Sequence, residues 1–164
     1  MKCVNLPNLL RMIGVALIAF APASADAAPS VRINNLADVA FGTISNFTSD
    51  QTSSQSICIY STAAGGLYQI TATGSGSGGA FTLASGTDTM AYEVQWAATA
   101  GQTTGTSLTA GVALTGLTSN ATKSGCTSGP SSSASLITVL RTAEIGAAKS
   151  GSYSGTMTLL VAPN

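Results

Sequence analysis

Few side chains in this sequence could carry out acid–base or nucleophilic chemistry. The chain contains no histidine, which excludes Ser-His-Asp and Cys-His catalysis, histidine general bases and ordinary zinc sites. Beyond residue 27, Asp88 and Glu93 are the closest pair of carboxylates in sequence. A glycosidase needs two carboxylates facing across a cleft, one with a raised pKa, whereas we expect one of these in a turn and the other on the polar face of a strand. The sequence therefore predicts a protein that is not an enzyme and has no catalytic residue.

The glycine-rich stretch "GSGSGG" formally matches a nucleotide-binding motif through Gly74, Gly76 and Gly79. That motif binds phosphate when a strand precedes it and a helix follows, because the helix N-terminus holds the anion. Here the strand-like stretch "AFTLAS" follows instead. We therefore expect a flexible hairpin loop, and neither a cofactor nor a metal site.

Two cysteines, Cys58 and Cys126, remain once Cys3 is set aside with the N-terminal segment. In an oxidising compartment an even pair is expected to form a disulfide, and two independent thiols are the alternative. A disulfide that closes a loop of this length stabilises a fold by roughly 4 kcal/mol in the chain-entropy account.

The N-terminal segment has the layout of a secretory signal peptide. Two basic residues flank a short polar stretch, the uncharged apolar run "MIGVALIAFA" follows, and "PASADA" offers small residues for cleavage. We expect cleavage after Ala27, with cleavage after Ala25 as the alternative. Because the apolar run is too short to span a bilayer, we expect residues 1–27 to be a signal peptide, residues 28–164 to form one exported domain, and no membrane insertion.

The expected mature chain is nearly neutral, and charged residues make up only 7% of the whole sequence. Such a balance of charges provides no excess of basic residues that would attract nucleic acid or acidic lipid, so no nucleic-acid partner is expected. Ser, Thr, Gly and Ala are abundant instead. This composition fits an exported β-protein that is kept soluble by hydroxyl groups.

Short β-like runs recur along the chain, separated by Gly, Ser and Asn clusters. The closing run, "GSYSGTMTLLVAPN", places Tyr153, Met157, Leu159 and Val161 on one face, which is the pattern of a half-buried strand. About eight such strands joined by turns predict an antiparallel sandwich. We expect strands at 31–44 with a phase break near Leu36, then at 56–61, 66–74, 80–85, 90–99, 110–117, 135–143 and 151–161, with one long loop at 118–133.

The aromatic residues are few and lie in the strand-like runs. Tyr68, Tyr92, Trp96 and Tyr153 are in phase with neighbouring apolar residues. We therefore expect them to pack in the core. A platform of stacked aromatics for binding sugars is the alternative.

Four short motifs are spread over residues 31–161. They are "VAFGTI", the cysteine and tyrosine strands in "CIYSTAAGGLYQI", the tyrosine strand in "MAYEVQW", and the closing run. Together they resemble the spore coat U domain, the pilin-like module of archaic chaperone–usher fimbriae in Gram-negative bacteria. The closing run is the most specific, since that family tends to end with Gly-x-Tyr-x-Asp-Thr and then alternating apolar and threonine residues. The matching residues are Phe41, Gly42, Cys58, Tyr68, Ile70, Tyr92, Gly151, Tyr153, Thr156, Met157, Thr158, Leu159 and Val161.

The resemblance implies an all-β, incomplete immunoglobulin-like antiparallel β-sandwich whose last strand is missing. It implies a strand-acceptor groove lined by Val39, Phe41, Met157, Leu159 and Val161. It also implies three partners: a periplasmic pilus chaperone that fills the groove first, an outer-membrane usher, and a neighbouring pilus subunit whose arm replaces the chaperone by β-strand addition. The protein would then be a fimbrial subunit with a role in adhesion and biofilm, exported to the periplasm and displayed on the surface of a Gram-negative cell.

The departures from the family pattern carry information. Family members often have a cysteine in the first strand and this chain does not, so Cys126 must pair differently. Gly155 stands where an aspartate is expected. Residues 28–41 must supply both a donor arm and the first strand, so we expect a tip or minor subunit that accepts a strand without donating one, unless "APSVRI" is the arm. The alternative is a self-sufficient secreted β-sandwich that binds a carbohydrate or a surface.

Overall fold

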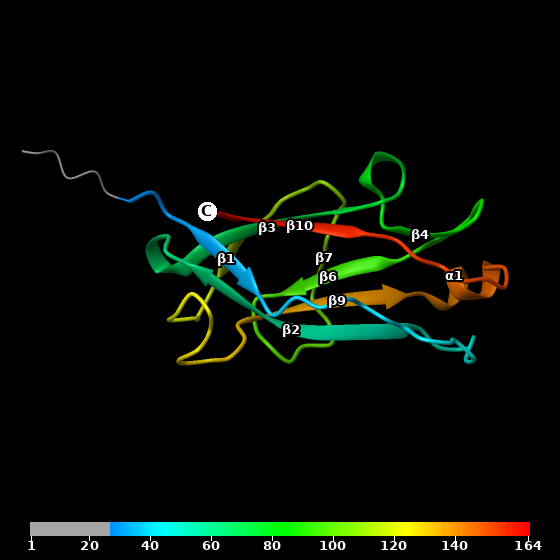
Figure 1. Cartoon of the computed structure of the whole chain (residues 1–164), viewed down its shortest axis with the longest axis horizontal. Helices are drawn as coiled ribbons and strands as arrows, with labels where there is room; N and C mark the ends of the chain where they lie inside the picture. Colours follow the sequence, from blue (N-terminus) through cyan, green and yellow to red (C-terminus); the bar gives the residue numbers. More distant parts are fainter. Residues whose placement is uncertain (1–26) are drawn as a thin grey trace, which may run out of the picture.

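The computed structural model describes residues 27–164, which fold into antiparallel sheets arranged as a sandwich (Figure 1). The predicted all-β sandwich is therefore confirmed. The predicted signal peptide, except for its last residue, lies outside the described residues. The strands are β1 (Val31–Asn34), β2 (Gln51–Ser61), β3 (Leu67–Gly74), β4 (Thr82–Ser85), β5 (Asp88–Ala91), β6 (Glu93–Ala97), β7 (Thr106–Ser107), β8 (Leu114–Thr118), β9 (Ala134–Leu140) and β10 (Met157–Pro163). The helical segments are η1 (Ala64–Gly66), η2 (Ser77–Gly79) and α1 (Thr142–Ala147).

The larger sheet has the strand order β1-β2-β9-β6-β7. Every residue of β9 is buried, because strands flank it on both sides and the loop after β6 lies over its outer face. Ser135 on β9 binds that loop, donating to the carbonyl oxygen of Thr99 at 2.9 Å and accepting from the N–H of Gln102 at 3.0 Å. On its other edge, β2 pairs with β1 only from Ser61 to Cys58.

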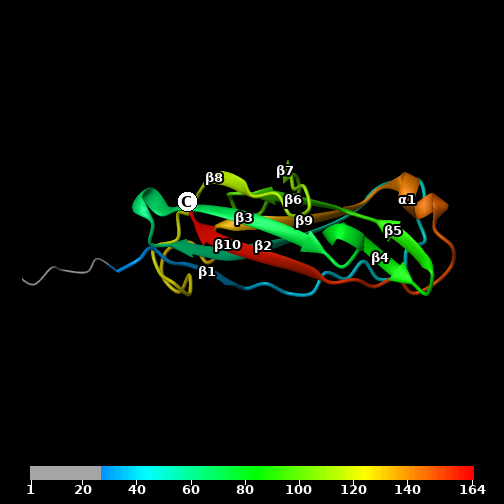
Figure 2. The ribbon, with the colours of Figure 1, turned by 90° about the horizontal axis from the view of Figure 1, so that it is seen from above.

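The smaller sheet, with the order β10-β3-β8, packs over the larger one (Figure 2), and β4 and β5 form a separate hairpin. Along β3, Tyr68, Ile70 and Ala72 are fully buried, while the residues between them are half-buried. This alternation is expected of a strand that packs one face on a core.

The core contains the predicted aromatic residues. Trp96 is 1% exposed, and its indole Nε1–H donates to Tyr68 Oη at 3.1 Å, with the two rings edge to face. Tyr92 is also buried and packs against Phe81, while Tyr153 is half-buried against the same core. The predicted core role is confirmed for these aromatic residues.

One predicted strand proves to be divided, and another ends earlier than predicted. The run at 90–99 breaks at Tyr92 into β5, which pairs with β4, and β6, which pairs with β9 in the larger sheet. The break cannot be seen in the sequence, because the alternation of buried residues continues through it, from Met90 on β5 through Tyr92 to Val94 and Trp96 on β6. The predicted strand at 135–143 ends at Leu140, and the short helix α1, which was not predicted, follows it.

The first predicted strand, 31–44, was too long. β1 ends at Asn34 because Asn35 has a φ of +64°, a left-handed conformation that turns the chain out of the sheet. Val39 and Phe41 therefore lie outside any strand.

Other strand boundaries also differ from the prediction. The closing strand begins at Met157, so Tyr153 lies before it. β2 begins at Gln51, earlier than predicted. The sequence did not reveal this start because the first half of the strand is polar and shows no alternation of apolar residues. β8 begins at Leu114, and the two-residue strand β7 was missed.

The glycine-rich stretch was predicted to be a hairpin loop, but β3 before it and β4 after it belong to different sheets and form no hairpin. The glycine-rich stretch contains η2 and leads into β4, so a strand follows it. The predicted loop at 118–133 contains no strand after Thr118.

Candidate functional site: the unpaired edge of β10

β10 lies at the edge of the smaller sheet, where β3 is its only strand partner within residues 27–164. The ladder runs from Met157 opposite Gly74, through Leu159 opposite Ala72, to Pro163 opposite Tyr68. The other edge of β10 is hydrogen-bonded to no strand in this part of the chain, although β1 lies near it. A free edge presents unpaired N–H and C=O groups, which can template the addition of another strand.

The inward-facing residues of β10 are less buried than those of β3, with which they pair. Ile70 and Ala72 on β3 are wholly buried, with exposed fractions of 0%. Met157, Leu159 and Val161 pack against the same core and are only half-buried. Since both rows face one core, this difference means that the core is incompletely covered along β10.

Residues 35–47, here called the 35–47 segment, follow β1 and belong to no strand or helix. This segment passes along the same side of the sandwich as the free edge of β10 (Figure 2), and β1 itself neighbours β10. Val39, Phe41 and Ile44 are half-buried on this segment, and the latter two pack against the core. The predicted groove residues therefore divide between two elements: three lie in one row on β10, and Val39 and Phe41 lie on the 35–47 segment.

Cys58 and Cys126 form the predicted disulfide; their Cα atoms are 6.0 Å apart, and the two residues are separated by 68 positions in sequence. Cys58 lies on β2 opposite Asn34 of β1, and Asn34 Nδ2 donates to the carbonyl oxygen of Ser124 at 2.7 Å. The loop around Cys126 is therefore attached to both β1 and β2, at the point where the 35–47 segment begins. Disulfides of this kind persist in oxidising compartments outside the cytoplasm.

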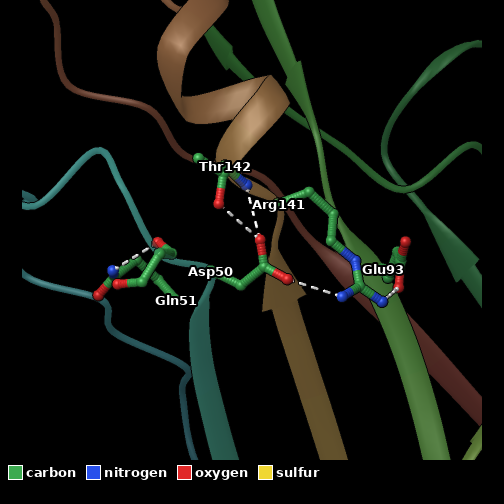
Figure 3. Close-up of polar contacts among 6 residues, drawn as sticks. Asp50, Gln51, Glu93, Arg141 and Thr142 are labelled. Carbon is green, nitrogen blue, oxygen red and sulfur yellow. Dashed lines mark hydrogen bonds and ion pairs between the residues drawn. The ribbon is translucent and has the colours of Figure 1, made fainter.

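A polar network joins three strand ends on the larger sheet (Figure 3). Arg141 Nη1 donates to Asp50 Oδ2 at 2.7 Å, and Arg141 Nη2 donates to Glu93. The backbone N–H and the hydroxyl of Thr142 each donate to Asp50 Oδ1 at 2.8 Å. The network thus links the start of β2, the start of β6 and the junction between β9 and α1.

The network shifts the pKa values of its own members. The hydrogen bond from the Thr142 backbone N–H, together with the bond from Arg141, lowers the pKa of Asp50 to about 2. The bond from Arg141 also lowers the pKa of Glu93, and both carboxylates raise the pKa of Arg141. A catalytic general acid needs a shift in the opposite direction for its carboxyl group.

The two carboxylates singled out in the sequence belong to separate ion pairs. Glu93 binds Arg141, while Asp88 accepts from Lys149 Nζ at 2.6 Å. Asp88 begins β5 rather than lying in a turn. The sequence reasoning did not find Asp50 or Arg141, because they lie 91 positions apart in sequence and only the pairing of β2 with β9 brings them together.

Two glycines that bear on the family resemblance have identifiable backbone roles. Gly42 has a φ of +65°, which glycine adopts at little cost. A Cβ at Gly155 would lie 2.8 Å from the carbonyl oxygen of Thr82, so the backbones approach too closely for the aspartate that the resemblance leads one to expect. The other motif residues near the C-terminus, Gly151, Tyr153 and Thr156, lie in the stretch that leads into β10.

The described part of the chain gathers no group of three or more His, Cys, Asp or Glu side chains suited to a metal ion. In the same residues, no helix is long and apolar enough to cross a membrane.

A scan against protein-family models and a search of curated proteins each gave no match. Among solved structures, a chain from one described as a chaperone–tip adhesin complex vital for synergistic activation of CFA/I fimbriae biogenesis is similar to this protein. The likeness has a TM-score of 0.51 and 15% sequence identity and covers 83% of this chain. It covers 41% of that chain, less than half of its length.

At this level of identity the likeness concerns the fold. The protein is an antiparallel, sandwich-like β-protein that resembles a component of a fimbrial assembly complex. Its disulfide is a feature of proteins that fold in oxidising compartments outside the cytoplasm.

Proposed function

We propose that this protein is a structural subunit of a fimbria, assembled by donor-strand complementation. An extended segment of another polypeptide pairs with the free edge of β10 and places alternate apolar side chains over its inward-facing row. The observation that carries this proposal is the half-burial of Leu159 and Val161 beside the fully buried Ile70 and Ala72. Strand addition of this kind takes affinity from backbone hydrogen bonds and specificity from the alternate side chains.

The energetics favour an incoming strand. Fully burying a Val, Leu or Met side chain contributes roughly 1.5–3 kcal/mol. Met157, Leu159 and Val161 are already partly buried, so at most about 1 kcal/mol per residue is left for a partner to gain. Each new backbone hydrogen bond adds about 0.5–1.5 kcal/mol. Left uncovered, such an edge invites aggregation.

The proposed partners follow from that risk. A periplasmic pilus chaperone covers the β10 edge after export, an outer-membrane usher receives the complex, and a neighbouring subunit then supplies the final strand. This order of assembly steps is in keeping with the chaperone and the fimbriae named for the similar solved structure, and with the resemblance to the spore coat U domain. The product would be a fimbria on the surface of a Gram-negative cell, with a role in adhesion and biofilm.

We further propose a tip or minor position in the fibre. β1 pairs with β2 of its own sheet from Val31 to Asn34, so these residues are already used within the subunit and cannot also serve as a donor arm. With the expected cleavage after Ala27, only residues 28–30 precede β1. A subunit of this design accepts a strand and does not donate one.

The proposal is tested by giving the subunit a strand of its own. The full chain is exported to the periplasm of a Gram-negative host, either unchanged or with a flexible linker and a strand of alternating valine and threonine added after Asn164. We expect the unchanged chain to aggregate as its concentration rises and to melt at a low temperature, and the extended chain to remain a soluble monomer with a higher melting temperature.

The control extension carries aspartate in place of each valine and should give no rescue. A stable monomer from the unchanged chain, melting cooperatively at the same temperature as the extended one, would contradict strand acceptance. That result would instead favour a self-sufficient secreted binding module.

A further inference from the structure

The side chain of Gln55 holds the backbone of the 35–47 segment. Gln55 Oε1 accepts the N–H of Ala37 at 2.8 Å, and Gln55 Nε2 donates to the carbonyl oxygen of Ala37 at 3.0 Å. Both backbone groups of one residue are therefore bound by one carboxamide. This is the pair of bonds that an opposing residue forms in an antiparallel ladder.

The carboxamide acts where β2 has no strand on this edge. β1 pairs with β2 only as far as Cys58, and from Gln51 to Ile57 the only strand partner of β2 in the described chain is β9, on its other edge. The 35–47 segment passes this stretch without forming a ladder. The side chain of Gln55 therefore links the 35–47 segment to β2, in place of the backbone hydrogen bonds that a paired strand would form.

Further contacts hold the start of the segment, and Gln55 extends their effect towards its apolar residues. Asn35 Nδ2 donates to the carbonyl oxygen of Ser131 at 3.3 Å, which ties the beginning of the segment to the disulfide loop. Phe41 and Ile44 pack against the core a few residues beyond Ala37. With Ala37 fixed, the backbone that carries Phe41 is held beside the partly uncovered core.

We propose that Gln55 is a positioning residue for strand acceptance, an inference that rests on the proposed function. By fixing Ala37, it holds the 35–47 segment in place before the partner arrives, so that the incoming strand meets an ordered surface formed by this segment and β10. Ordering a segment at the moment of binding lowers affinity, and ordering it beforehand avoids that loss.

The test separates positioning from general stability. Gln55→Ala removes both bonds to Ala37, and Gln55→Glu removes the N–H donor while keeping an acceptor of the same length. The matched control is Gln69→Ala, on the outward-facing side of β3 between the buried Tyr68 and Ile70. The probe is a synthetic peptide in which three valines alternate with threonines between terminal lysines.

Three quantities are measured on the full oxidised chain: hydrogen exchange at the Ala37 amide, the Kd for the peptide, and the free energy of unfolding without peptide. In Gln55→Ala we expect faster exchange at Ala37 and a Kd roughly tenfold higher, equivalent to the loss of one good interaction. Gln55→Glu should change the Kd in the same direction by a smaller factor, and Gln69→Ala should leave both the exchange and the Kd unchanged.

Faster exchange at Ala37 with an unchanged Kd in Gln55→Ala would overturn the positioning role and leave strand acceptance intact. A Kd that rises equally in Gln69→Ala would also overturn it. A wild-type chain that binds no peptide would instead refute the proposed function on which the inference rests.

Discussion

Leu159 and Ala72 are direct partners across the ladder between β10 and β3, yet Ala72 is wholly buried and Leu159 is only half-buried. Two residues at one level of one sheet, facing one core, should be covered alike if the strands around them were complete. The difference locates the incomplete side of the sandwich at the outer edge of β10.

Leu159 and Leu160 allow a matched pair of substitutions on one strand. Leu159 faces the core, whereas Leu160 faces outward and is 64% exposed. We expect Leu159→Asp to abolish binding of a valine–threonine donor peptide and to prevent surface display, because a charge would be placed under the incoming strand. Leu160→Asp should bind the peptide like the wild type. Peptide titration by fluorescence anisotropy measures both variants, and equal affinities would contradict the assignment of the inward face.

The disulfide should contribute strongly to stability. Replacing Cys58 and Cys126 together by alanine opens a loop of 68 positions. We expect the free energy of unfolding to fall by roughly 4 kcal/mol, since the unfolded chain regains the entropy that the cross-link removed. Urea denaturation of the oxidised wild type and the double variant gives the difference. A loss below about 1 kcal/mol would mean that the loop is held mainly by its hydrogen bonds to β1 and β2.

The network around Asp50 predicts a loss of stability in acid. The pKa of Asp50 is about 2 in the folded protein, below its ordinary value of 3.8, so between these values the unfolded chain binds more protons than the folded one. The stabilisation is therefore complete above about pH 4 and is lost as the pH falls towards 2. Urea denaturation at a series of pH values should give a smaller slope in this window for Asp50→Asn than for the wild type. Equal slopes would exclude Asp50 as the titrating group.

Tyr68→Phe should destabilise the core by about 1–3 kcal/mol, because it leaves the buried indole N–H of Trp96 without its acceptor. Trp96 is the only tryptophan in the sequence, so its fluorescence reports directly on this contact during denaturation. Tyr60→Phe, on β2 in the larger sheet, is the control and should change stability little, since Tyr60 is only partly buried. Equal stability of Tyr68→Phe and the wild type would indicate that water replaces the lost hydroxyl.

Alternation along a strand was readable from the sequence, and the break at Tyr92 was not. β3 and β10 follow the predicted period of two because each packs a single face on the core. β5 and β6 keep one continuous alternation although they belong to different sheets. The alternation of apolar residues indicates which face of a strand is buried, and carries no information about which strand pairs with it.

The polar contacts at the candidate site were not predictable for a related reason. Gln55 and Ala37 lie 18 positions apart, and Arg141 and Asp50 lie 91 apart, with no motif in either pair. The sequence did partly indicate where β1 ends. A phase break was expected near Leu36, and the neighbouring Asn35, a residue type that tolerates a left-handed φ, has that conformation.

The sequence by itself determined the class of fold, the pairing of its two cysteines and the inward face of β10, because these depend on residue type, local period and the number of thiols available. The tertiary structure decided that β10 has a strand on one side only, that Gln55 binds the 35–47 segment, and that Arg141 joins Asp50 to Glu93. These features arise from contacts between residues far apart in the chain. Their geometry is set by how the sheets stack, a property that no local stretch of sequence encodes.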